Sequence, residues 1–203
     1  MNRKRSQGRF VFGCVAPAVI LVILFMFIPT VNVFRMSLFR MGGITNKKEF
    51  VGMQNFKTLL GDRNFLEAMQ NSIVIIVMVT ICTIFLAVLF AALLSRGNFK
   101  GKNIFRVIFY IPNILSIVVI AGIFGAIYDP SNGLLNTFLR AIHLDGLAHQ
   151  WMGDPKIVLY SVIFALVWQA IGYYMVMYMA SMAAIPEDLY EAASLDGSTE
   201  IQT

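Results

Sequence analysis

Long uncharged apolar runs alternate with shorter polar segments along the chain. The runs cover about residues 10–34, 71–94, 107–128 and 157–179, and none of them contains Asp, Glu, Lys or Arg. Each run is long enough to cross a hydrocarbon core of roughly 30 Å as a helix. The pattern predicts an all-α, polytopic membrane protein with four transmembrane helices, and no linker separates residues 1–203 into more than one membrane domain.

The first run has two features that need interpretation. A basic segment precedes it, as in a secretory signal peptide, but the apolar core of a signal peptide is typically about 7–15 residues long. Residues 10–34 exceed that length, so we interpret them as a retained span with a cleaved leader as the alternative. Pro17 and Pro29 each remove a backbone donor, and we expect them to kink or end the helix.

The charges of the polar segments suggest the topology. Residues 95–106 carry four basic side chains and no acidic one, which places this hairpin in the cytoplasm by the positive-inside rule. The N-terminus is then cytoplasmic as well. Residues 35–70 should fold against the membrane, although their six basic residues complicate the rule. In the second outer segment, 129–156, we expect a helix near 134–142 and a Trp151 at the membrane interface.

Composition excludes several functions. Apolar residues make up 58% of the chain and charged residues 13%, whereas soluble domains carry about a quarter charged residues. The net charge of +5 is spread between the spans and forms no nucleic-acid-binding face. The spans lack the ionisable groups of ion-coupled transporters. Without a phosphate-binding loop or metal-ligand spacing, we predict no cofactor, no metal and no enzymatic activity, and we treat His143 and His149 as solvated.

Two groups of polar residues inside the spans are candidates for a solute pathway. Asn113 and Ser116 follow Pro112, where a loosened backbone can line a water-filled path, but a kink satisfied by Ser116 explains them equally well. The fourth span offers hydrogen-bonding and aromatic groups suited to a polyhydroxylated solute, although helix contact or an interfacial position is the commoner role of such tyrosines. These residues are Gln169, Tyr173 and Tyr174.

A short acidic helix is predicted for residues 186–196. Pro186 suits the first helical position, the acidic residues after it suit the helix dipole, and Gly197 can adopt the left-handed conformation that ends a helix. Leu189, Ala192 and Ala193 fall on one side. A helix this short is marginal in water, so it needs a partner into which it docks.

The sequence around this helix resembles a known family. Glu191-Ala192-Ala193 followed by Gly197 resembles the EAA loop of ABC-importer permeases, and the whole stretch 185–197 resembles the maltose-type sugar permease branch. The two outer segments also resemble that branch, through Phe50-Val51-Gly52-Met53-Gln54-Asn55-Phe56 in the first and Gly133-Leu134-Leu135-Asn136 with Trp151 in the second.

The resemblance implies a multi-pass subunit of the bacterial plasma membrane. Such a subunit pairs with a second permease, binds two ATP-binding cassette subunits, contacts membrane lipid and receives a sugar from an extracytoplasmic solute-binding protein. The terminal helix would couple it to the ATPase through Glu187, Leu189, Tyr190, Glu191, Ala192, Ala193, Asp196 and Gly197. An amphipathic helix lying on the membrane is a weaker alternative, because the polar face has no Lys or Arg.

Several functional alternatives remain open at this point. The solute can be another polar compound, such as glycerol phosphate or an oligosaccharide. A secondary transporter or a non-transporting scaffold belongs to a different class. The family's pattern continues beyond the glycine and adds two more spans, to six in all, whereas this sequence stops at Thr203. We therefore expect a C-terminally truncated permease that does not transport alone.

Overall fold

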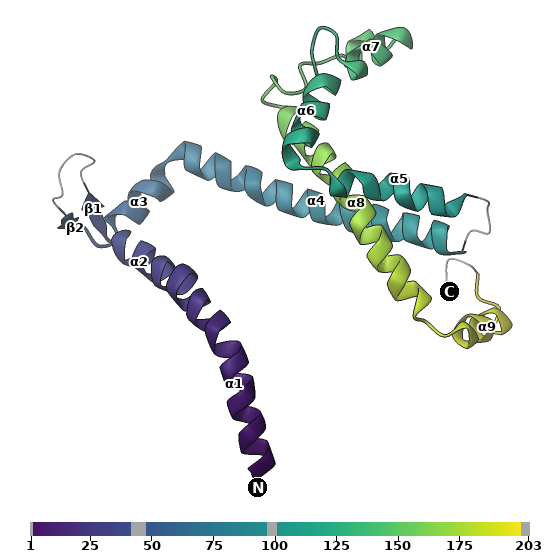
Figure 1. Cartoon of the computed structure of the whole chain (residues 1–203). Coiled ribbons are helices and arrows are strands. Elements are labelled where there is room, and N and C mark those ends of the chain that lie inside the picture. The colour runs from purple at the N-terminus through teal and green to yellow at the C-terminus, as the bar shows by residue number, and fades with distance from the viewer. Residues whose placement is uncertain (1, 42–47, 97–100, 200–203) are drawn as a thin grey trace. The chain divides into compact units, whose positions relative to one another are not determined.

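The computed structural model describes residues 2–41, 48–96 and 101–199 and divides the chain into two compact units, Met1–Met69 and Gln70–Thr203 (Figure 1). Residues 97–100 of the predicted cytoplasmic hairpin lie outside the described residues. So does the end at Thr203, and the predicted truncation stays a prediction. The prediction of a single membrane domain for residues 1–203 also stays a prediction.

The first unit begins with a long helix that the prolines do not end. Helix α1 (Asn2–Val22) contains Pro17, continues through the π-helical segment η1 (Ile23–Phe27) and runs on as α2 (Ile28–Met36). The wider π turn lies where the Pro29 ring would meet the Phe25 carbonyl in a regular α-helix. The Thr30 hydroxyl donates to the Met26 carbonyl at 2.6 Å. The helix therefore continues past both prolines, and of the two expected effects the structure shows a local distortion before Pro29 and not an end.

The first outer segment contains strands that the sequence analysis does not predict. Strands β1 (Phe39–Met41) and β2 (Lys48–Phe50) pair antiparallel, with Phe39 opposite Phe50 and Arg40 opposite Glu49. Helix α3 (Gln54–Gly61) follows. The Asn55 amide donates to the carbonyls of Ser37 (2.7 Å) and Phe39 (3.1 Å), which holds α3 against the end of α2.

The second span is longer than the uncharged run that predicts it. Helix α4 extends from Arg63 to Arg96, ahead of the predicted start at residue 71. Asp62 caps it by accepting from the Asn64 backbone N–H at 2.9 Å, and Arg63 pairs with Glu67 at 2.8 Å one turn on. These polar contacts support a helical turn before the apolar run begins.

The predicted third span is not one continuous helix. Helices α5 (Lys102–Ile114) and α6 (Ile117–Ile127) are bent by 103° at the break between them. Pro112 removes a donor near the end of α5, Leu115 is extended, and the Ser116 hydroxyl accepts from the Val119 N–H at 3.4 Å to cap α6. This corrects the prediction for residues 107–128 and shows that Ser116 satisfies the break.

The remaining elements follow the predicted order. Helix α7 (Leu134–Ala141) and the short 3₁₀ turn η2 (Asp145–Leu147) occupy the second outer segment, followed by α8 (Val158–Ala183) and α9 (Glu187–Leu195). Within the described residues three helices are long and apolar enough to cross a membrane, and the bent pair α5–α6 can supply a fourth span. The predicted all-α membrane fold is confirmed, apart from the small β1–β2 hairpin.

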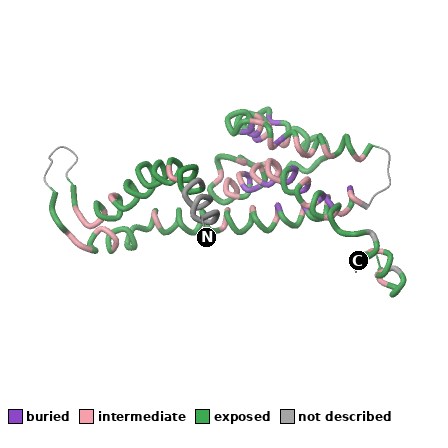
Figure 2. Tube along the Cα trace, turned by 60° about the horizontal axis from the view of Figure 1, so that its bottom comes forward, coloured by how far each residue is buried: buried purple, intermediate pink, exposed green. Residues whose placement is uncertain are grey.

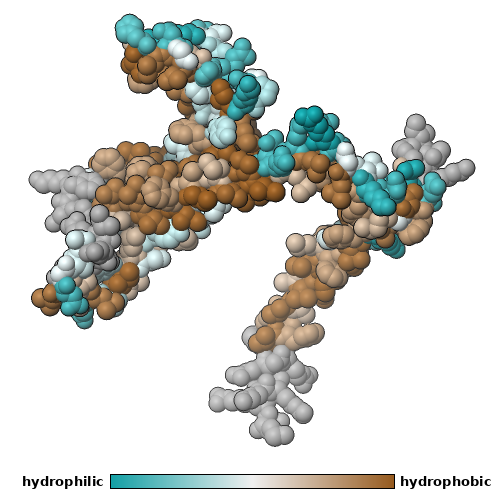
Figure 3. All heavy atoms as spheres, turned by 180° about the vertical axis from the view of Figure 1, so that it is seen from behind, coloured by the Kyte–Doolittle hydropathy of each residue, from teal (hydrophilic) through white to brown (hydrophobic). Residues whose placement is uncertain are grey.

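The second unit has its core between α4 and α8. Ala87 and Ala91 are completely buried against Met175 and Met179. Ile163, Val167 and Ile171 continue this contact along α8. Buried positions gather at these helix contacts (Figure 2), while hydrophobic side chains cover much of the outer surface of the spans (Figure 3). Such a surface is suited to contact with lipid. In a bilayer the hydrophobic effect does not drive helices together, and close packing at small residues does.

Candidate functional site

Helix α9 begins close to the predicted position. The backbone N–H of Leu189 donates to the Pro186 carbonyl at 3.2 Å, so Pro186 lies one residue before the helix rather than within its first turn. The acidic residues that follow lie where the positive end of the helix dipole stabilises negative charge. The side chain of Glu187 lies outside the described residues, although its backbone is helical.

The end of α9 is a left-handed glycine cap. Gly197 has φ +79°, and the Ser198 N–H donates back to the Ala193 carbonyl at 3.1 Å. The Ser198 hydroxyl donates to the same carbonyl at 2.6 Å. A Cβ at Gly197 would meet nothing within 4 Å, so the requirement for glycine comes from its backbone conformation and not from crowding.

The exposed surface of α9 is apolar as well as acidic. Leu189 is 61% exposed and Leu195 88% exposed, and Ala192 between them is also exposed. Asp188, Glu191 and Asp196 are exposed too, whereas Tyr190 and Ala193 are half-buried. Leaving two leucines exposed to water on a nine-residue helix is energetically unfavourable. The surface is suited to docking against another protein.

The candidate pathway residues lie on two helices that touch. Helices α5 and α8 pack so closely at Gly172 that a Cβ there would overlap the Phe109 carbonyl and lie 2.8 Å from the Tyr110 Cα. Asn113 is half-buried on α5, and Gln169 is half-buried on α8. Tyr173 and Tyr174 are 47% and 38% exposed, with their rings edge to face at 5.3 Å.

The structure therefore brings four of these residues together on one helix pair and gives the fifth, Ser116, a structural role. Asn113, Gln169 and the two tyrosines belong to one helix pair, whereas Ser116 serves as the cap of α6. Within the described residues, no hydrogen bond joins Asn113 to Gln169. Sequence reasoning missed Gly172, whose only signal is a glycine in the middle of an otherwise large-residue span.

A second residue that sequence reasoning left without a role is Asn136. It is 2% exposed, and its amide donates to the carbonyls of Pro130 (3.2 Å) and His149 (3.0 Å) while its oxygen accepts from Trp151 Nε1 (2.8 Å). Asn136 thereby ties α7 to both flanks of the second outer segment. Trp151, predicted at the interface, is held in this network and stacks on Tyr128.

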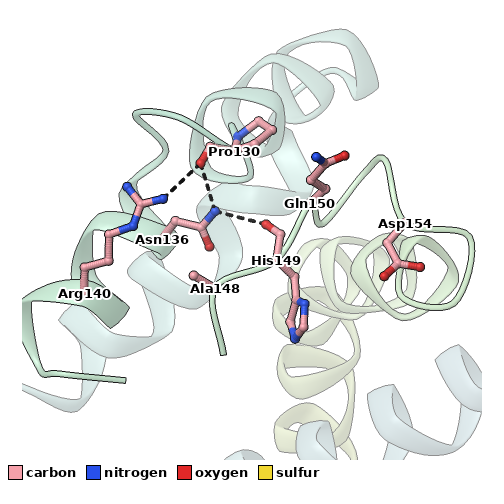
Figure 4. A pocket seen from close by; sticks show the side chains of 7 residues that line it. All are labelled: Pro130, Asn136, Arg140, Ala148, His149, Gln150 and Asp154. Atoms are coloured by element: carbon pink, nitrogen blue, oxygen red, sulfur yellow. Dashed lines mark hydrogen bonds between the residues drawn. The ribbon is translucent and has the colours of Figure 1, made fainter. Parts of the chain in front are cut away.

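A polar cavity of about 540 Å³ lies beside this network, and Figure 4 shows the side chains that line it. Arg140 reaches toward the Pro130 carbonyl at 3.4 Å, and His149, Gln150 and Asp154 complete the wall. His143 and His149 are both exposed. A separate apolar cavity of about 500 Å³ lies between α6, α7 and α8, with Phe124, Trp151 and Trp168 in its lining.

Comparison with known proteins gives consistent matches. The family described as "Binding-protein-dependent transport system inner membrane component" matches residues 83–203. A probable ABC transporter permease protein, YurN of Bacillus subtilis, is 38% identical over 92% of this chain and 64% of its own length. A diacetylchitobiose uptake system permease protein, NgcF of Streptomyces coelicolor, is 30% identical over 79% of this chain and 48% of its own.

A solved structure supports the same fold. A chain of a bacterial alginate ABC transporter, determined in complex with an alginate pentasaccharide-bound periplasmic protein, superimposes with a TM-score of 0.80 at 22% identity. The alignment covers 98% of this chain and 66% of the solved one, and this chain spans between about half and two thirds of the length of these proteins. The matched residues include the α4–α8 core, the broken α5–α6 pair and the capped helix α9, and the chain belongs to the family of binding-protein-dependent transport system inner membrane components.

Proposed function

We propose that this chain is a transmembrane permease subunit of an ATP-driven sugar importer. It forms the translocation path with a second permease, receives its solute from an extracytoplasmic binding protein, and couples to two cytoplasmic ATPase subunits through α9. ATP hydrolysis belongs to those partners. The proposal of a carbohydrate solute is supported by a relative named for diacetylchitobiose uptake and by the fold of an alginate transporter.

The observation that carries this proposal is the combination of a fixed end and an uncovered surface on α9. Pro186 and Gly197 fix where the helix begins and ends, while Leu189 and Leu195 remain exposed. A pre-formed helix loses little conformational entropy on binding, so the exposed leucines and alanines can contribute their burial to docking. ATP binding then acts on the permease through a difference in affinity between its two conformations.

The docking test uses two single-cysteine variants of the permease, with Cys14 and Cys82 replaced by alanine, assembled with its partners. Leu189→Cys lies on the exposed face of α9, and Leu134→Cys, 70% exposed on α7, serves as the control on the opposite side of the membrane. We expect Leu189→Cys, and not Leu134→Cys, to cross-link to the ATPase subunit in an ATP-dependent manner. Cross-linking of Leu134→Cys alone would show that α7, and not α9, faces the ATPase, and it would contradict the coupling role.

The coupling test separates backbone conformation from side-chain size at Gly197. Gly197→Val places a β-branched residue at a positive φ, whereas Gly197→Asn keeps a residue that tolerates it. We expect uptake and ATPase stimulation to fall by roughly five- to thirtyfold in Gly197→Val, the consequence of a conformational penalty of about 1–2 kcal/mol, and to be largely retained in Gly197→Asn. Equal activity of the two variants would show that coupling does not depend on the left-handed conformation at Gly197.

A further inference from the structure

The segment between the first two spans is held at the membrane boundary by both of its ends. Helix α2 ends at Met36 and α4 begins at Arg63, and both belong to helices long and apolar enough to cross a membrane. A segment that joins consecutive spans starts and ends on one side of the bilayer. The Asn55 hydrogen bonds to Ser37 and Phe39 keep α3 beside the end of α2.

Helix α3 and Met53, the residue before it, share an apolar face that their own unit covers only in part, at the half-buried Phe56. Met53, Phe56 and Leu60 fall on one side at i, i+3 and i+7 spacing, and Gln54 and Thr58 lie on the other. Met53 is 60% exposed and Leu60 64% exposed. Phe50, at the end of β2, is 67% exposed and in edge-to-face contact with Phe39 at 5.3 Å. An amphipathic helix of this kind favours the boundary between headgroups and acyl chains.

The charges beside this face are positive. Residues 35–69 contain six basic and three acidic side chains. The Arg63–Glu67 pair offsets one of the acidic groups, and Glu49 lies opposite Arg40 in the strand register. Lys48 and Lys57 are exposed, and within the described residues neither lies in salt-bridge distance of a carboxylate. Lys57 flanks the apolar face, from which a long side chain can reach the headgroups while its stem stays on apolar surface.

We infer that β2 and α3 form an interfacial anchor for anionic phospholipid. Phe50, Met53 and Leu60 insert at the level of the upper acyl chains, and Lys48 and Lys57 bind headgroup phosphates. A soluble protein is the competing occupant of the same surface. The membrane is favoured because both ends of the segment continue into spans, and because exposed apolar side chains flanked by lysines match a charged bilayer surface.

The test measures the depth of two faces of α3 in the whole permease reconstituted into nanodiscs. In a background with Cys14 and Cys82 replaced by alanine, a fluorophore is attached at Met53→Cys on the apolar face or at Thr58→Cys on the polar face. Quenching by nitroxide-labelled lipid and by aqueous iodide is compared between phosphatidylcholine and phosphatidylglycerol discs. Lys48→Gln and Lys57→Gln remove charge, and Lys57→Arg is the matched control that keeps it.

We expect the Met53→Cys label to be quenched by lipid nitroxide and shielded from iodide, with the reverse at Thr58→Cys. The docked fraction should be higher in phosphatidylglycerol than in phosphatidylcholine. The equilibrium constant for docking should fall about fivefold for each lysine removed, and it should be unchanged in Lys57→Arg. Salt at about 1 M should reduce the phosphatidylglycerol effect. Equal iodide access for the two labels in both lipids would overturn the anchor, as would shielding that depends on an added solute-binding protein. Identical behaviour of Lys57→Gln and Lys57→Arg would overturn its electrostatic part.

Discussion

The contact at Gly172 predicts that two chemically identical substitutions have opposite effects. Gly172→Ala adds a methyl group where α8 meets the α5 backbone, and Gly122→Ala adds the same group on α6, where nothing lies within 4 Å. Both positions are helical, so both variants gain the same intrinsic helix propensity, about 1 kcal/mol relative to glycine. The difference between them then isolates the cost of separating α5 from α8.

The size of that cost follows from the geometry. The new Cβ would lie 2.8 Å from the Tyr110 Cα and closer still to the Phe109 carbonyl, whereas carbon atoms pack comfortably at about 3.5–4.0 Å. The obstructing atoms are main chain, which no rotamer change can move. Overpacking of this kind costs about 1–3 kcal/mol. We expect Gly122→Ala to be neutral or slightly stabilising and Gly172→Ala to be less stable than Gly122→Ala by that amount.

The chain supplies its own probe for this measurement. Cys82 is partly buried where α4 packs on Ile163, Val167 and Ile171, and Cys14 is exposed. In a Cys14→Ala background, a thiol-reactive dye therefore reports the thermal opening of the α4–α8 core. A difference of about 1–3 kcal/mol corresponds to a separation of roughly 2–10 °C between the two variants. A Gly172→Ala melting temperature equal to or above that of Gly122→Ala would refute the close contact.

Two further predictions concern single polar side chains. Asn136→Leu keeps the volume of the side chain but removes three hydrogen bonds and leaves the Trp151 N–H unpaired. In a Trp168→Phe background, the emission of Trp151 should shift and its accessibility to acrylamide should rise, whereas unchanged emission would contradict the network. Ser116→Ala removes the cap of α6 and should lower stability by about 1 kcal/mol, with Ser116→Asp as the control that retains a cap. Equal melting temperatures for these two variants would count against capping.

The sequence predicts best those features whose causes are local. Uncharged apolar runs locate the spans, and the start and stop of α9 follow from Pro186 and Gly197 within a dozen residues of sequence. The helix of the second outer segment is confirmed for the same reason, as α7.

The features that the sequence does not predict depend on contacts between distant segments. Nothing near Pro112 distinguishes a mild kink from a 103° bend, because the direction of α6 depends on what Ile120 and Phe124 pack against. The early start of α4 depends on a cap and an ion pair that hydropathy does not register. The β1–β2 hairpin is too short to show a period of two. Asn55 and Asn136 appear in the sequence as motif letters, and only the fold shows which carbonyls they hold.

The same distinction explains why the proposed coupling helix is better defined than the proposed solute path. Helix α9 needs only its own ends, whereas a path needs the faces of α5, α6 and α8 to be known together. Residues 184–186 join α9 to α8, and α8 meets α5 through main-chain atoms at Gly172. A displacement of α9 should therefore carry α8 and α5 as one body, while α6 turns away at Ser116. On this geometry we expect Gln169 and Asn113 to keep their relation to one another during movement, and any change in the proposed path to occur where the bent pair meets α8.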